Sequence, residues 1–182
     1  MNNKKVLVVV DMQNDFCRPD GALFVPGAVE AVANVAKLIN DKAVSKVVFT
    51  ADYHPENHCS FGTWPVHCVG GTEGADIVDE LIIACQKSRT PYNLVLKGQE
   101  QDKEEYGAFA VKEANKEPLK ILEGFDEVIV CGVAGDFCVM ESIKNMKPLW
   151  SKMKLYSDGV ASIKGDHIIE DFIKETKLIQ KI

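Results

Sequence analysis

Apolar residues along this chain fall into short runs that are separated by longer amphipathic segments. Five runs lack strict alternation and are rich in β-branched residues, a pattern typical of strands buried on both faces of a parallel sheet. These runs are Val6–Val10, Lys46–Thr50, Asn93–Leu96, Glu127–Val133 and Lys154–Ser157. The segments between them repeat apolar residues at helical spacing, most clearly over Ala28–Asn40, which follows a Pro-Gly turn.

Four further segments carry helical patterns, and they alternate with the strands. They are Asp76–Cys85, Glu113–Leu122, Cys138–Met146 and Asp166–Ile179. Pro118 should interrupt the second of them, because proline cannot donate the helical hydrogen bond. The alternation predicts an α/β fold, a three-layer αβα sandwich around a mostly parallel, doubly wound sheet. The polar segment 98–107 is expected to be a mobile loop.

Size and charge narrow the class of protein. The 182 residues fit one domain, residues 1–182, that is large enough to bury its own core. The net charge of −6 argues against nucleic acid or an anionic membrane as a partner. No apolar run approaches membrane-spanning length, and the amino-terminal run is too short for a signal peptide, so we expect a cytoplasmic protein. The six cysteines form no tight framework and are expected to be reduced thiols.

Three of the four histidines lie within the segment Asp52–Cys68. Asp52 and His54 alternate at the end of a predicted strand, so their side chains can point to the same face. With His67 they would form a facial set of two imidazoles and one carboxylate, which suits zinc, iron or manganese. The alternative is a polar surface loop with scattered histidines. The density of ligand types favours one divalent metal ion.

Other chemically active residues follow the remaining strands. Asp11 ends the first strand, Lys97 ends the third, and Cys138 comes shortly after the fourth. Because strand ends meet at one edge of such a sheet, these side chains should converge. A thiolate of Cys138 at a helix start, beside the ammonium of Lys97, would be a nucleophile, and Asp11 could carry its proton. The set predicts nucleophilic acyl transfer. The alternative reading of Cys138 is a buried cysteine at a helix start.

Several separate motifs, in order, carry a resemblance to a known family. They are Asp11–Phe16, Asp52–Pro55, His58–Phe61, Trp64–Cys68, Lys97-Gly98 and Gly132–Val139. From Val6 to about Ala161, the chain resembles the nicotinamidase (pyrazinamidase) branch of the isochorismatase-like cysteine hydrolases.

The resemblance implies a role for each matching residue. Asp11, Lys97 and Cys138 match the family's catalytic triad, and the metal ligands match Asp52, His54 and His67. The position of His58 ligates in some members only, so a fourth protein ligand stays open.

The resemblance also implies a binding pocket and an oxyanion hole. The Val133–Ala134 peptide matches a cis peptide, and the N–H groups of Ala134 and Cys138 match the oxyanion hole. Phe16, Trp64 and Tyr106 correspond to residues that enclose the substrate ring, although core packing is the alternative reading of all three.

The activity implied is metal-dependent hydrolysis of nicotinamide to nicotinate and ammonia through a thioester, a step of NAD salvage. Pyrazinamide would fit equally well, and zinc is the first expectation for the metal, with manganese and iron as alternatives. Rival readings are a hydrolase of another small amide, a non-catalytic metal-binding or redox-sensing relative, and a metallohydrolase that uses metal-bound water. Self-association into a homo-oligomer stays open.

Three features depart from the family pattern. Gly135 stands where the family commonly has threonine, and Gly107 stands where serine is usual. The segment after Cys138 lacks the usual alanine-rich helix, and Pro148 should end that helix early.

Overall fold

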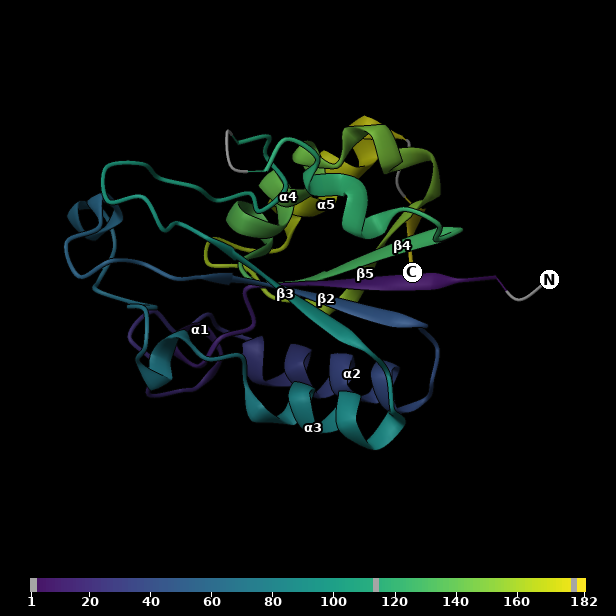
Figure 1. Ribbon diagram of the computed structural model, residues 1–182, viewed down its shortest axis with the longest axis horizontal. Helices are drawn as coiled ribbons and strands as arrows, with labels where there is room; N and C mark the ends of the chain where they lie inside the picture. Colours follow the sequence, from purple (N-terminus) through teal and green to yellow (C-terminus); the bar gives the residue numbers. More distant parts are fainter. Residues whose placement is uncertain (1–2, 113–114, 178–179) are drawn as a thin grey trace.

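The computed structural model of the protein describes residues 3–112, 115–177 and 180–182. All of its paired strands run parallel in one sheet of order β3-β2-β1-β4-β5-β6 (Figure 1). Their bounds are β1 Lys5–Val10, β2 Lys46–Asp52, β3 Tyr92–Lys97, β4 Glu127–Gly132, β5 Met153–Val160 and β6 Gln180–Lys181. Strands β2 and β3 are added on one side of β1 and strands β4 to β6 on the other, and this reversal of strand order between β1 and β4 confirms the doubly wound α/β fold.

Helices cover both faces of the sheet. In Figure 1, α1 (Asn14–Cys17), α2 (Ala28–Asn40) and α3 (Asp79–Ser88) lie below the sheet, whereas α4 (Met140–Asn145) and α5 (His167–Thr176) lie above it. Strand β1 shows why its sequence does not alternate. Leu7 and Val9 belong to the core on one face, while Val6, Val8 and Val10 belong to the core on the other. Both faces need apolar residues because both are covered.

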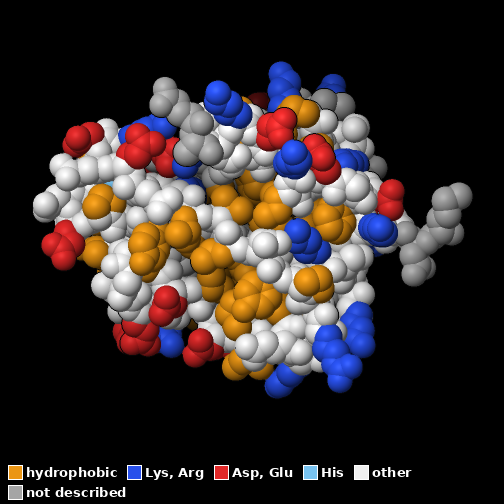
Figure 2. Space-filling view, viewed as in Figure 1, with side chains coloured by type: hydrophobic (Ala, Val, Ile, Leu, Met, Phe, Trp, Pro, Cys, Tyr) orange, Lys and Arg blue, Asp and Glu red, His pale blue; other side chains and the backbone are white. Residues whose placement is uncertain are grey.

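The edges of the sheet differ from its centre. β3 is an edge strand, and its side chains Tyr92 and Leu94 are 44% and 52% exposed. Figure 2 shows apolar side chains gathered in the middle of the face on which Figure 1 presents β3. β6 is only two residues long, too short for an apolar pattern to predict. No helix of the described residues is long and apolar enough to cross a membrane.

The predicted helices match less closely than the strands. The predicted helix Asp76–Cys85 begins three residues later, because residues 76–78 are extended and pair with the chain around the start of α1. The amide of Asn14 donates to the carbonyl of Asp76, and the amide of Val78 donates to the carbonyl of Met12. Of the prediction over Glu113–Leu122, residues 115–117 are not helical, a 3₁₀ helix spans Pro118–Leu122, and residues 113–114 lie outside the described chain. The predicted helix Asp166–Ile179 corresponds to α5, which ends at Thr176; residues 178–179 lie outside the described part of the chain.

The predicted helix over Cys138–Met146 is divided into two parts. A π-helical turn spans Gly135–Val139, and the α-helix α4 begins only at Met140. α4 ends at Asn145, and a 3₁₀ turn containing Pro148 follows, as the proline predicts. Cys138 therefore lies inside a π turn and not at the first residue of an α-helix.

Candidate active site

The carboxyl ends of four strands bring the predicted triad and metal residues to one edge of the sheet. Asp52 and Lys97 are the last residues of β2 and β3 and stand opposite each other in the strand register. Asp11 directly follows β1, and Cys138 lies in the π turn after β4. This is the convergence that parallel strands produce.

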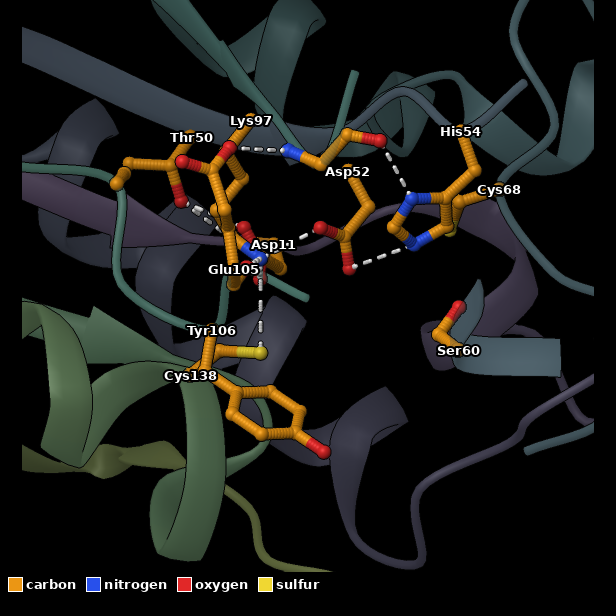
Figure 3. Close-up of polar contacts among 12 residues, drawn as sticks. Asp11, Thr50, Asp52, His54, Ser60, Cys68, Lys97, Glu105, Tyr106 and Cys138 are labelled. Atoms are coloured by element: carbon orange, nitrogen blue, oxygen red, sulfur yellow. Dashed lines mark hydrogen bonds and ion pairs between the residues drawn. The ribbon is translucent and has the colours of Figure 1, made fainter. Parts of the chain in front are cut away.

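Lys97 is the centre of the arrangement (Figure 3). Its fully buried ammonium lies 2.8 Å from Asp11 Oδ2 and 2.6 Å from Asp52 Oδ1. Its Nζ also lies 3.7 Å from Cys138 Sγ. One atom each of Asp11, Asp52 and Cys138 lies within 4.8 Å of the others. One lysine therefore contacts the thiol, the triad carboxylate and a residue of the metal set.

Asp11 is held by both its backbone and its side chain. Its φ of 49° lies in the left-handed region, which aspartate tolerates better than most residues. The amide of Asp11 donates to the carbonyl of Thr50 at 3.1 Å, and the Thr50 hydroxyl donates to Asp11 Oδ1 at 2.6 Å. The turn thus leaves Oδ2 directed to the ammonium.

Burial and the neighbouring charges set the protonation states. Burial lowers the pKa of Lys97, but Asp11 and Asp52 more than compensate and raise it well above its ordinary value, so Lys97 is an ammonium. Burial raises the pKa of Asp11 and so does Asp52, while Lys97 opposes both. Burial likewise raises the pKa of the Cys138 thiol well above its ordinary value, against the lowering effect of Lys97. Burial thus favours the protonated thiol, and Asp11, with an oxygen within 4.8 Å of the sulfur, is the neighbouring carboxylate that can accept its proton.

The predicted metal ligands form a second cluster beside the first. One ligand atom each of Asp52, His54 and His67 lies within 4.8 Å of the others, and all three residues are buried. His54 Nδ1 donates to the Gly98 carbonyl at 2.8 Å, and His67 Nδ1 donates to the Pro65 carbonyl at 2.6 Å. A carbonyl can only accept, so both Nδ1 atoms carry hydrogen and both Nε2 lone pairs are free for a metal.

The protonation of His54 also suits a ligand. Burial lowers its pKa to about 4, with the hydrogen bond to Gly98 opposing and the neighbouring His58 and His67 adding to the effect. The ring is therefore neutral at pH 7, the form that binds metals. Two neutral imidazoles and one carboxylate are a donor set that fits a divalent transition metal.

His58 lies next to this cluster with both ring nitrogens already bonded. Its ring stacks on that of His54, with centroids 3.9 Å apart. Nδ1 lies 2.7 Å from Ser60 Oγ and accepts from the Ser60 amide at 3.3 Å, while Nε2 donates to the Lys103 carbonyl at 3.0 Å. In this arrangement His58 supports the ring of His54 and orders the loop; it has no lone pair left for a metal.

A cleft opens beside the thiol and the metal cluster. Its empty space, including the open mouth, is about 390 Å³. The three aromatic residues predicted from the sequence, Phe16, Trp64 and Tyr106, all line it. Trp64 Nε1 donates to the Tyr106 hydroxyl at 3.2 Å, which links two of these walls. Asp52, His67, Glu104 and Cys138 add polar side chains to the lining, and Ala134 lines it as well.

The backbone before the thiol carries the predicted oxyanion site. The Val133–Ala134 peptide is cis, as the resemblance implies. Ala134 lines the cleft, and its amide has no acceptor among the residues that the structure describes. An unpaired N–H beside the thiol is the type of donor that an oxyanion requires.

Phe137 is a wall of the cleft that sequence reasoning missed. Its ring meets Trp64 edge-on at 5.2 Å and lies 5.6 Å from Tyr106. Leu23 and Ile163 also line the cleft. The position of Phe137 directly before Cys138 was an available signal, whereas Leu23 and Ile163 lie in loops far from any motif.

Two glycines that depart from the family pattern are explained by their neighbours. A Cβ added at Gly135 would lie 2.4 Å from Ser162 Oγ and 2.7 Å from Val160 Cγ1. A Cβ added at Gly107 would lie 2.1 Å from Asn145 Oδ1. In this chain other side chains occupy the space that a threonine or serine would need. Gly135 is therefore tightly packed, contrary to the loose turn that a glycine suggests.

Comparison with known proteins identifies the family of the chain. The family model described as "Isochorismatase domain" matches residues 5–179. The chain belongs to the isochorismatase family. Within the family it is 31% identical, over 94% of both chains, to the nicotinamidase of Saccharomyces cerevisiae.

Solved structures of the isochorismatase family show the same fold. PnC1 from L. infantum, in complex with nicotinate, superimposes with a TM-score of 0.82 at 30% identity, covering 100% of this chain and 93% of that chain. The pyrazinamidase of Pyrococcus horikoshii, in complex with zinc, has a TM-score of 0.75 at 32% identity, with 98% of each chain covered. Together with the yeast nicotinamidase, these structures place the chain in the nicotinamidase branch of the family.

Proposed function

We propose that this protein is a nicotinamidase, a cysteine amidohydrolase that converts nicotinamide to nicotinate and ammonia. The observation that carries the proposal is the shared lysine: Lys97 lies 2.8 Å from Asp11 and 3.7 Å from the Cys138 thiol, in a cleft with a metal donor set. The nicotinamidase and pyrazinamidase relatives, and the nicotinate complex of one of them, support the choice of substrate.

The cleft suits a small planar aromatic amide. Phe16, Trp64 and Tyr106 offer ring surfaces, and Asp52, His67 and Cys138 offer polar groups. Stacking against these rings positions a flat heterocycle with its carboxamide toward Cys138. Holding the reacting carbon near the sulfur removes much of the entropic barrier.

The residues Asp52, His54 and His67 would hold one divalent metal ion. Zinc is the first candidate, since a relative is known in complex with zinc and the donor set suits it. The ion would supply a Lewis acid that binds the substrate ring nitrogen and fixes the ring in the cleft. Asp52 fits both tasks: Oδ1 contacts Lys97 while Oδ2 is directed toward His54 Nε2, at 3.7 Å.

In the acylation half, Asp11 accepts the thiol proton as Cys138 Sγ attacks the carboxamide carbon. Lys97 stabilises the negative charge that moves from Asp11 to sulfur and then onto the amide oxygen. The amide of Ala134, with that of Cys138, donates to this oxygen. Asp11 then passes its proton to the departing nitrogen, the C–N bond breaks, and ammonia leaves a thioester on Cys138.

In the deacylation half, Asp11 accepts a proton from water, whose oxygen attacks the thioester carbon. The C–S bond breaks, the proton returns from Asp11 to sulfur, and the acid leaves, losing its carboxyl proton to solvent to become nicotinate. The raised pKa of Asp11 suits both steps, because a carboxylate with a higher proton affinity is a better base.

Ammonia release from nicotinamide tests the proposal. The purified protein is assayed as isolated, after chelation, and after addition of zinc, manganese or iron, with Cys138→Ala beside it. Activity that is lost on chelation, restored by one ion and absent from the variant is expected. Full activity of Cys138→Ala would rule out the thioester mechanism and favour hydrolysis by metal-bound water. Metal binding without turnover of nicotinamide would point to another small amide.

A further inference from the structure

A buried carboxylate lies behind the triad, in the polar segment 98–107. The Glu105 side chain is only 5% exposed, and it belongs neither to the triad nor to the metal donor set. Its Oε2 accepts hydrogen bonds from the Gly98 amide at 3.0 Å and from Lys112 Nζ at 2.8 Å. Lys103 Nζ, on an exposed side chain, lies 3.5 Å from its Oε1. Burying a carboxylate is costly unless it is bonded in this way.

Gly98 connects Glu105 to the metal cluster. The carbonyl of Gly98 accepts the hydrogen bond from His54 Nδ1 at 2.8 Å. Its φ is +63°, and an added Cβ would lie 2.4 Å from the His54 ring. The Gly98 backbone is thus packed directly against the imidazole, and the carboxylate of Glu105 fixes the amide at its other side (Figure 3 shows both Glu105 and His54).

Glu105 also contacts the triad through its main chain. Its carbonyl oxygen accepts from Lys97 Nζ at 3.1 Å, which makes it the third oxygen around that ammonium. The next residue, Tyr106, is a wall of the cleft. Movement of Glu105 would therefore displace the contacts of His54, Lys97 and Tyr106 at the same time.

We propose that Glu105 is a positioning residue: it fixes the metal ligand His54 through Gly98 and fixes Lys97 through its own carbonyl oxygen. Lys112 holds the carboxylate in place. The inference rests on the proposed metal site, because the groups that orient metal-bound histidines set metal affinity and activity. It explains why a strongly polar loop contains one acid that is buried.

Glu127 provides a matched control. It is also a buried glutamate paired with lysines, with Lys154 Nζ at 2.7 Å and Lys5 Nζ at 3.6 Å. It begins β4, at the end of the sheet opposite the site. Glu127→Ala should therefore disturb stability as Glu105→Ala does, without reaching His54 or Lys97.

The experiment titrates metal-free protein with Zn²⁺ in competition with a chromogenic chelator, and records the visible spectrum with Co²⁺. Glu105→Ala should weaken zinc affinity about tenfold or more, alter the cobalt spectrum and lower kcat. Glu105→Gln keeps an acceptor for the Gly98 amide and should restore most of the affinity. Glu127→Ala should bind zinc as the unsubstituted protein does.

Unchanged zinc affinity in Glu105→Ala, together with the Tm loss seen in Glu127→Ala, would reduce Glu105 to a structural role and overturn the inference. If Glu105→Ala does not fold, Lys112→Met is tested in its place. That variant removes the lysine that holds the Glu105 carboxylate against Gly98, so zinc affinity should be several-fold weaker. Absence of zinc binding by the unsubstituted protein would instead refute the proposed metal site. The zinc titration does not use nicotinamide. A protein that does not hydrolyse nicotinamide would therefore still give a valid comparison of zinc affinities.

Discussion

Lys97 Nζ lies 2.6 Å from Asp52 Oδ1, so the lysine of the triad is bonded to a carboxylate of the metal set. The two parts of the site therefore share one buried charge network. A change in the triad should therefore affect the metal donor set, and the reverse. Removal of Lys97 is the most direct test of this coupling.

Lys97→Met should leave Asp11 and Asp52 as two unpaired buried carboxylates. Breaking a buried pair in this way costs about 3–5 kcal/mol, so the free energy of unfolding of the metal-free protein should fall by that order. Urea denaturation measures the loss. Adding Asp11→Asn should recover part of the stability without restoring turnover; no loss in the single variant would show that Lys97 does not hold the network together.

Cys138→Ala and His54→Ala should separate catalysis from metal binding. Cys138→Ala removes the nucleophile and should lower ammonia release by more than about 10⁴-fold while retaining metal, since loss of a nucleophile has effects of this size. His54→Ala should lose metal and bind substrate more weakly. Metal analysis of both purified variants, beside the assay, checks the pair; loss of metal from Cys138→Ala would contradict it.

Tyr106→Phe removes the hydroxyl that accepts from Trp64 Nε1 at 3.2 Å. The cleft wall should loosen, so KM for nicotinamide should rise several-fold with little change in kcat, because the hydroxyl does not contact the thiol. Steady-state kinetics tests the split between KM and kcat. The fluorescence of Trp64 should change in the same variant, and a fall in kcat alone would assign Tyr106 to the chemical step.

Gly135→Ala should be destabilising because its Cβ would lie 2.4 Å from Ser162 Oγ. Overpacking of a buried site costs about 1–3 kcal/mol. Adding Ser162→Gly removes the obstructing hydroxyl and should recover part of the loss. Thermal unfolding of the single and double variants gives the comparison, and a stable single variant would mean that the turn is loose.

Alkaline pH should destabilise the protein through its buried thiols. Burial, with the nearby charges of Asp11 and Glu80, raises the pKa of Cys17 to about 12, and burial raises the pKa of Cys85 to about 11, from an ordinary value near 9. As pH rises above 9, the unfolded chain loses these protons first, so the free energy of unfolding falls between pH 9 and the folded values. The effect should reach about 1–2 kcal/mol per thiol near pH 10.5.

Urea denaturation in the presence of a reductant, from pH 8 to about pH 10.5, measures this slope. Cys17→Ala should show a smaller slope than the unsubstituted protein. An equal slope in both would mean that other groups, such as tyrosines and lysines, control the alkaline loss.

The strands of the sheet, the catalytic triad and the metal ligands were predictable because each depends on local sequence. Strands buried on both faces require unbroken apolar runs, and parallel strands bring their ends together, so Asp11 and Lys97 could be placed side by side without coordinates. The histidine cluster was predictable for the same reason: His54 follows a strand end, and metal ligands are rare residue types.

Other features depend on contacts between distant segments. The π turn around Cys138 begins at Gly135, which packs against Ser162 and Val160 from a later part of the chain, and no spacing in the sequence reveals that contact. α3 starts late because Asp76 and Val78 form hydrogen bonds with the chain around the start of α1. Glu105 is one acid among several in a polar stretch, and only its bonds to Gly98 and Lys112 set it apart.

The order of the site residues along the chain has a consequence for biosynthesis. Asp11, the metal donors and Lys97 all precede Gly98, whereas the thiol of Cys138 follows β4, the strand that docks beside β1. A nascent chain that has emerged only to Gly98 holds every metal donor but no nucleophile. The site is therefore complete only when β4 pairs with β1 and brings Cys138 to Lys97.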